Sequence, residues 1–220
     1  MHKKIGGIGL AAAIAAILAL PAGEASAQAC AGWPAAQGQF SVGARFAAEP
    51  WTAAELGSSL GVEAGLNRVG NAAVFGYVDL VSREVNEVED NGRDPVIGLA
   101  AAYEIGTLVP ALPGWLSACP VASVAMQRID ETTYFSIPLG LGFGTSIEIE
   151  GITVMPYAIP QFQLFQVGID DLTWDHQFGI GFGAMARLAD MFYAGIEFNR
   201  AFVDGAEFDF ALRGGITFPR

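Results

Sequence analysis

The feature that most constrains this chain is a strict two-residue alternation near its C-terminal end. Positions 208 to 218 read Phe-Asp-Phe-Ala-Leu-Arg-Gly-Gly-Ile-Thr-Phe. Successive side chains of a β-strand point to opposite faces, so one face of this strand is aliphatic and aromatic. The other face mixes glycine with Asp209 and Arg213. This is the reverse of what a soluble core requires, so the apolar face is expected to contact lipid.

The whole chain is apolar but offers no ordinary membrane-spanning helix. Only 15% of the 220 residues are charged, and the mean hydropathy is +0.40. Beyond the N-terminus there is no apolar run of the ~18 residues that a transmembrane helix needs. In hydrocarbon every backbone N–H and C=O must be satisfied internally, and apart from a helix only a closed β-barrel achieves this.

The first residues are typical of a secretory signal. Lys3 and Lys4 precede an apolar run, 5–20, and a small-residue site, Ala25-Ser26-Ala27, follows it. We therefore predict a signal peptide at 1–27 and one barrel domain at 28–220. The net charge of −12 argues against binding to nucleic acid and against attachment to a membrane surface by basic residues.

The same alternation recurs upstream and predicts an all-β fold, a transmembrane antiparallel up-and-down β-barrel of about ten strands. An eight-stranded barrel is the alternative, because the fifth segment is short. Pro156 and Pro160 each remove a ladder donor and are expected to introduce bulges. The predicted segments are 39–47, 58–67, 72–82, 95–105, 120–128, 133–148, 151–167, 176–188, 191–202 and 208–218.

The links between these segments predict how the barrel is oriented. Outer-membrane barrels alternate short periplasmic turns with longer external loops. With the N-terminus in the periplasm, the periplasmic links are mostly tight, whereas external links such as the polar stretch 82–94 are longer and acidic. Cys30 and Cys119 then lie on the same, oxidising side, where we expect a disulfide that ties the N-terminal lead to the rim of the barrel.

Tryptophans and the acidic loop add two further expectations. Amphipathic rings near strand ends suit the interfacial girdles of membrane barrels. The acidic stretch 82–94 resembles a calcium-binding loop only superficially. Gly98 stands at the position where such a loop needs a bidentate carboxylate as its last ligand. We expect a solvated external loop, with weak divalent-ion bridging to lipopolysaccharide as the alternative. The tryptophans, all outside the predicted strands, are Trp33, Trp51, Trp115 and Trp174.

The chain resembles the small outer-membrane β-barrel superfamily that includes the OmpA-type transmembrane domain, OmpW and the opacity-type proteins. The residues that carry the resemblance are the signal peptide, the glycine-rich stretch 137–144, Pro156-Tyr157 and the C-terminal 212–218. The resemblance implies an outer-membrane location and makes Phe218 the counterpart of a terminal aromatic assembly signal. The expected partners are outer-membrane lipid, lipopolysaccharide, the barrel-assembly machinery and periplasmic chaperones, and the expected state is a monomer.

Charged residues on the predicted inner face are the most informative constellation. Unpaired charges there would be costly, so we expect ion pairs between neighbouring strands. They predict a charged plug that fills the barrel and fixes its register. The alternative is a narrow water path that they line. The predicted lumen-facing charges are Arg45, Glu63, Asp79, Glu104, Arg187, Glu197, Asp209 and Arg213.

Catalysis and cofactors find little support in the sequence. His176 lies near Asp170, Asp171 and Asp175, but no serine stands beside it to complete a hydrolase site. We therefore expect no enzyme, no cofactor and no metal site. The predicted role is structural or surface-interacting, and the alternatives are a narrow channel for small solutes, a lipid-modifying outer-membrane enzyme and a soluble ligand-binding barrel with its apolar residues inside.

Overall fold

The computed structural model describes residues 27–34, 38–48, 56–67, 71–85, 88–105, 108–109, 112–113, 115–129, 132–167, 173–189, 191–203 and 208–219. Within these ranges a short helix, α2 (Ala27–Ala31), precedes the strands. The strands are β1 (Gln39–Ala48), β2 (Leu56–Asn67), β3 (Ala72–Val85), β4 (Val88–Tyr103), β5 (Ser117–Ile129), β6 (Thr132–Gly144), β7 (Ile147–Ile149), β8 (Ile152–Val167), β9 (Thr173–Leu188), β10 (Phe192–Ala201) and β11 (Asp209–Pro219).

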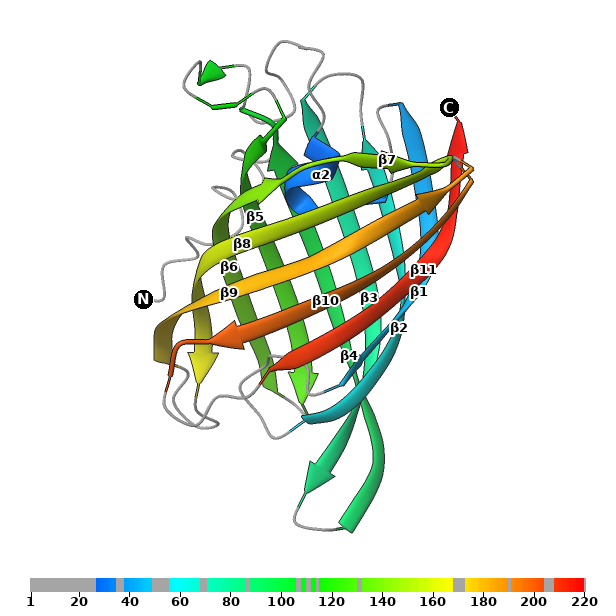
Figure 1. The fold of residues 1–220 in the computed structure, drawn as a ribbon. Coiled ribbons are helices and arrows are strands. Elements are labelled where there is room, and N and C mark those ends of the chain that lie inside the picture. The colour runs from blue at the N-terminus through cyan, green and yellow to red at the C-terminus, as the bar shows by residue number, and fades with distance from the viewer. Residues whose placement is uncertain are drawn as a thin grey trace.

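Ten of the strands form one closed antiparallel barrel (Figure 1). Consecutive strands pair from β1 to β6, β6 pairs with β8, and pairing continues through β9, β10 and β11 back to β1. Closure satisfies the backbone of every strand in the ring without leaving a free edge. The predicted all-β up-and-down barrel of ten strands is confirmed, and the eight-stranded alternative is wrong.

Two predicted boundaries differ from the structure. The polar stretch 82–94 is not a loop, because β3 and β4 continue through most of it as a hairpin that projects beyond the barrel (Figure 1). Outside the lipid a strand needs no apolar face, so the alternation stops before the strand does. The sixth segment breaks after Gly144, and β7 pairs with β8 instead.

Two local features affect the strand register around β8: the turn between β7 and β8, and the two prolines within β8. Glu150 and Gly151 both have positive φ and link β7 to β8 as a two-residue hairpin, which matches the right-handed strand twist. The bulges expected at Pro156 and Pro160 do not form, because the β8–β9 register runs without a shift from Ile152 to Val167.

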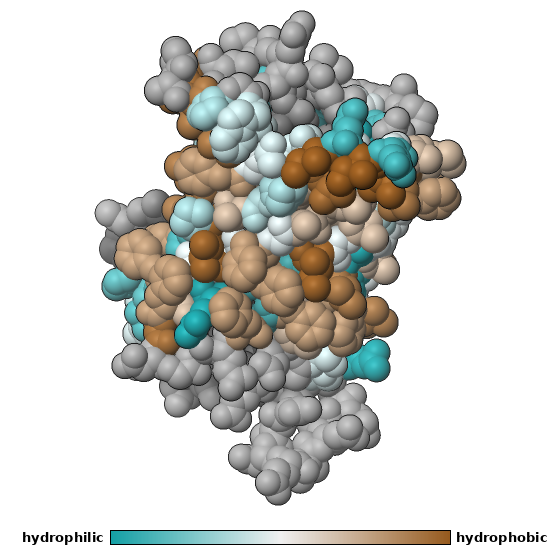
Figure 2. All heavy atoms as spheres, viewed as in Figure 1, coloured by the Kyte–Doolittle hydropathy of each residue, from teal (hydrophilic) through white to brown (hydrophobic). Residues whose placement is uncertain are grey.

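The two faces of each strand differ sharply in exposure. In β2, Leu60 and Val62 lie on one face and are 57% and 61% exposed. Glu63 lies on the opposite face and is 2% exposed. Apolar side chains also cover much of the outer face formed by β8 to β11 (Figure 2). The apolar face therefore points outward, as a transmembrane barrel requires, and the soluble alternative with apolar residues inside is wrong. Among the described residues no helix is long and apolar enough to cross a bilayer.

Candidate functional site

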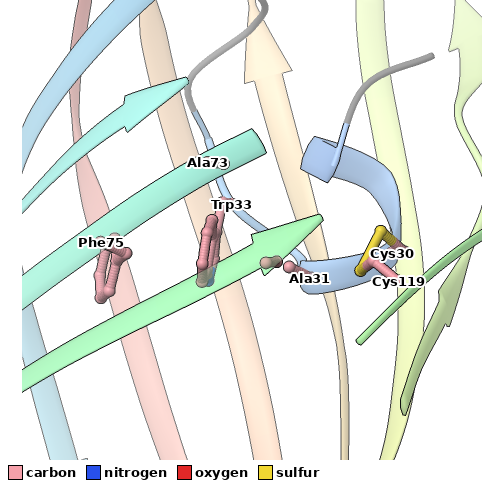
Figure 3. Close-up of a cluster of buried hydrophobic side chains, with 7 residues drawn as sticks. Cys30, Ala31, Trp33, Ala73, Phe75 and Cys119 are labelled. Carbon is pink, nitrogen blue, oxygen red and sulfur yellow. A yellow bond between two sulfur atoms is a disulfide. The ribbon is translucent and has the colours of Figure 1, made fainter. Parts of the chain in front are cut away.

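The N-terminal segment 29–34, which we call the plug, lies inside one end of the barrel. Helix α2 contacts β3, β4, β5, β6 and β8, and Figure 3 shows it within the ring of strands. The carbonyl oxygens of Ala29 and Cys30 lie against Gly144 and Gly142 of β6, where an added Cβ would overlap them. The glycines on the inner face of β6 therefore make the room that the plug occupies.

A disulfide between Cys30 and Cys119 ties the plug to β5 (Figure 3). The two cysteines are 89 positions apart in sequence, their Cα atoms are 5.9 Å apart, and both are fully buried. The expected disulfide is thus present, and it lies on the inner side of the barrel wall near one end. We call the end of the barrel that holds it the disulfide end, and the opposite end the loop end.

Trp33 packs the plug against the barrel wall. Its side chain is only 8% exposed and stacks on Phe75 of β3 at a centroid distance of 5.8 Å. The prediction that Trp33 lies in an interfacial girdle is therefore wrong, because the plug carries this ring into the lumen. Trp115 and Trp174 are exposed, and Trp51 lies outside the described residues.

A buried network of charges and hydroxyls crosses the barrel interior beside the plug. Arg213 Nε lies 2.9 Å from Glu63 Oε2, and Arg213 Nη1 lies 3.7 Å from Glu197 Oε2. Tyr193 donates to Glu63 Oε1 at 2.8 Å, and Tyr157 donates to Glu197 Oε2 at 3.0 Å. Charge-assisted hydrogen bonds of this kind are stronger than neutral ones and fix the side chains in place.

The longest of these contacts across the sheet depends on two glycines. Tyr193 of β10 pairs in register with Gly215 of β11, Gly215 with Gly43 of β1, and Gly43 with Glu63 of β2. The phenol therefore lies over two residues that lack a side chain and reaches a carboxylate three strands away. An added Cβ at Gly43 would overlap the Tyr193 hydroxyl. Tyr157 reaches Glu197 over Gly183 in the same way.

A second ion pair lies closer to the loop end. Arg45 Nε is 3.3 Å from Asp79 Oδ2, and Gly61 separates the two residues in the register. The Arg45 guanidinium also lies 4.6 Å from the centroid of the Tyr77 ring, within the range of a cation–π contact. Tyr77 itself lies over Gly98 of β4.

The other predicted lumen-facing charges are spread over the barrel. Glu104 is buried at the disulfide end, where it accepts a hydrogen bond of 3.1 Å from the Ala118 amide. Arg187 is half-buried in β9, opposite Tyr193 in the register. Asp209 is half-buried at the start of β11. The structure therefore gathers Arg45, Glu63, Asp79, Glu197 and Arg213 in the middle of the barrel and leaves the other three nearer its ends.

Between the plug and the loop end the barrel holds a cavity of about 220 Å³, and its two walls differ in polarity. The charged wall comes from β1, β3, β10 and β11 and carries both arginines of the network. The apolar wall comes from β4, β5, β6 and β8, and Trp33 and Phe75 form the floor. The charged-wall residues are Arg45, Asp79, Glu197, Asn199, Asp209 and Arg213, and the apolar-wall residues include Val96, Val121, Pro138 and Ile159.

Sequence reasoning did not find the hydroxyl and amide groups that complete this network. Tyr193 and Asn199 alternate correctly with the outward residues of β10, but nothing in the alternation shows that Tyr193 reaches Glu63 or that Asn199 donates to Glu197 at 3.0 Å. The available signal was a tyrosine at an inner position flanked, on the next strands, by glycines. It becomes readable only once the register is known.

His176 lies far from this network. It belongs to β9, its side chain is exposed, and its Nδ1 is 3.8 Å from Asp175 Oδ1, which is also exposed. Asp170 and Asp171 lie outside the described residues. Within the described part of the chain no group of three or more His, Cys, Asp or Glu residues is placed to hold a metal ion.

Comparison with known proteins identifies a fold and no family. No protein-family model matches the chain, and no curated protein sequence matches it. Among solved structures, the beta domain of the Bordetella autotransporter BrkA superposes with a TM-score of 0.52 at 15% identity, covering 82% of this chain and 99% of that one. The N-terminal beta-barrel domain of Pseudomonas aeruginosa OprF superposes with a TM-score of 0.40 at 13% identity, covering 83% and 98%. What the chain shares with the BrkA domain is its barrel fold.

Proposed function

We propose that this chain is an outer-membrane barrel closed to diffusion, with a structural or surface-interaction role in the cell envelope. One observation carries the proposal: the plug is bonded covalently to β5 and lies beside a buried network of ion pairs. Solute crossing the lumen would have to displace Trp33 and separate Arg213 from two carboxylates. Separating a buried ion pair leaves both charges uncompensated and is costly, so we expect the path to be closed at rest.

The same proposal fixes the orientation and partners. We place the disulfide end in the periplasm, because disulfides form and persist in that oxidising compartment. The exposed apolar face then contacts outer-membrane lipid and lipopolysaccharide, and residues 1–27 are removed as a signal peptide. Phe218, which is exposed and stacks on Phe40 at 6.4 Å, is the candidate signal for the barrel-assembly machinery. Periplasmic chaperones deliver the chain, which works as a monomer without a cofactor.

Recordings from planar lipid bilayers test the closed state. Purified wild-type protein should show no stepwise conductance. Replacement of Cys30 and Cys119 by serine, together with Trp33→Ala, should produce steps, because the plug then loses its tether and its main anchor. As a matched control, Trp174→Ala on the exposed surface should stay silent. Regular steps from the wild-type protein would overturn the proposal.

A narrow channel is the second candidate, and the cavity between the plug and the loop end favours it, because it leaves part of the lumen open. Its signature is specific. Wild-type steps that Arg213→Ala or Glu197→Ala abolishes would favour a channel lined by these groups. Silence in the wild type and in both variants would favour the closed barrel.

A further inference from the structure

The outer face of the barrel wall carries charge of one sign. The chain as a whole is acidic, with 23 Asp and Glu against 11 Lys and Arg. Among the described residues that alternate outward on the ten strands of the ring, however, none is Asp or Glu, and three are exposed arginines, Arg93, Arg128 and Arg200. The neighbouring carboxylates of Asp94 and Asp209 alternate to the inner face. Charge placed without regard to sign would put mostly carboxylates on this face, so its positive charge needs a physical cause.

All three arginines lie at the loop end. Arg128 and Arg200 are each one residue from the end of β5 and β10, and Arg93 pairs with Ser82 beside the register shift in the β3–β4 hairpin. Exclusion of charge from hydrocarbon explains why the middle of the outer face has none. It does not distinguish the two ends of the barrel. The difference between the ends therefore indicates that the two faces of the membrane differ in charge.

Arg200 shows at which depth these cations lie. Its guanidinium is 5.0 Å from the centroid of the Phe208 ring, and Phe208 meets Phe182 edge to face at 5.9 Å. Phe178 and Phe202 nearby are 60% and 64% exposed, and apolar side chains cover this part of the outer face (Figure 2). Exposed aromatic rings near strand ends mark the boundary between hydrocarbon and lipid headgroups. Arg200 therefore lies at the level of the headgroups.

The chemistry of the guanidinium group selects the headgroup. Its planar fork of N–H donors matches the oxygens of a phosphate and binds them in a bidentate way. Stacking on an aromatic ring holds the guanidinium in place, and contact with hydrocarbon strengthens its attraction to an anion. In the proposed orientation the loop end lies in the external leaflet, where the phosphates belong to lipopolysaccharide.

We propose that the outward arginines at the loop end, Arg93, Arg128 and Arg200, bind the phosphate groups of lipopolysaccharide. This inference rests on the orientation given in the proposed function and not on the closed lumen. Conductance steps in a bilayer would overturn the closed barrel and leave lipid binding unchanged. Loss of the phosphate preference would overturn this inference and leave a silent bilayer silent.

The test compares lipids that share acyl chains and differ in phosphate. Full-length protein folded in detergent is titrated with bisphosphorylated lipid A, with the same lipid after its phosphates are removed, and with phosphatidylglycerol, and native mass spectrometry counts the bound lipid. We expect bisphosphorylated lipid A to bind at least about tenfold more tightly than the dephosphorylated form, because each charge-assisted contact contributes on that scale. Equal binding of the two forms would overturn the proposal. Equal binding of phosphatidylglycerol would overturn the assignment to lipopolysaccharide.

Variants locate the site on the outer face. Arg200→Gln should lower the affinity for bisphosphorylated lipid A about tenfold and leave the dephosphorylated form unchanged. Arg187→Gln is the matched control, because it removes the same charge from a half-buried inner position of β9, and it should change neither. Equal effects of the two variants would show that only net charge matters. If Arg200→Gln does not fold, Arg128→Gln makes the same test on β5. An unchanged affinity in the folded outward variant would overturn the proposal.

Discussion

Two neighbouring glycines in β11 allow a sharp test of the barrel's orientation. Gly215 faces the lumen, where an added Cβ would overlap the Val42 carbonyl oxygen and lie 2.7 Å from the Tyr193 hydroxyl. Gly214 faces outward, and the nearest atom to an added Cβ there is the Tyr193 carbonyl oxygen at 3.5 Å, an ordinary contact. The same substitution at adjacent positions should therefore have opposite consequences.

The magnitudes follow from these contacts. Gly215→Ala forces a methyl group into a filled interior, which costs about 1 to 3 kcal/mol. It also displaces Tyr193 from its hydrogen bond to the Glu63 carboxylate, which costs about 1.5 to 3 kcal/mol more. Alanine is better than glycine in a strand by about 0.5 to 1 kcal/mol, which offsets part of this loss. We expect Gly215→Ala to lower the free energy of unfolding by about 2 to 5 kcal/mol, and Gly214→Ala to leave it unchanged or raise it slightly.

Equilibrium urea unfolding of protein refolded in detergent measures both variants, with heat-modifiable electrophoretic mobility as the check for a folded barrel. The reasoning is refuted if Gly214→Ala destabilises the protein as much as Gly215→Ala. It is equally refuted if both substitutions are neutral, because the inner face of β11 would then have room that the structure does not show.

Two further predictions concern the plug and the network. Replacing Cys30 and Cys119 together by serine opens a loop of 89 residues and should lower the free energy of unfolding by about 4 to 5 kcal/mol in the chain-entropy model; an unchanged urea midpoint under non-reducing conditions would count against a stabilising tether. Tyr193→Phe removes one hydrogen bond to Glu63 and should cost about 1.5 to 3 kcal/mol, whereas Tyr134→Phe, at a half-exposed position of β6, should cost under about 0.5 kcal/mol. Equal midpoints for the two tyrosine variants would contradict the network.

The sequence predicted the structure best within the bilayer, where contact with lipid requires alternating apolar residues. Within the bilayer each outward residue must be apolar, so alternation revealed the strands and their faces, including the short segment that became β5. The same reasoning failed where lipid no longer constrains the chain. The projecting part of the β3–β4 hairpin carries no alternation, so it was predicted as a loop. The alternation continues past Gly144, so the break in the strand at that point was not predicted.

The candidate site divides in the same way. Its charges could be predicted because an ionic group at an inner position is rare and conspicuous. Which charges meet could not, since pairs such as Arg213 with Glu63 join β11 to β2 across β1, over positions whose openness depends on register. Trp33 was misplaced because no local pattern says whether an aromatic ring outside a strand lies in the interface or inside the barrel.

By itself the sequence determined that this chain closes into a barrel with its apolar face outward. Strands with a two-residue alternation can pair all their backbone groups within a bilayer only in a closed barrel. The tertiary structure alone decided that the segment 29–34 lies inside the barrel. That outcome depends on the disulfide, on glycines that leave space for the Ala29 and Cys30 carbonyls, and on aromatic stacking between Trp33 and Phe75. Each of these contacts joins residues far apart in the chain, and only the curvature of the closed sheet brings them together.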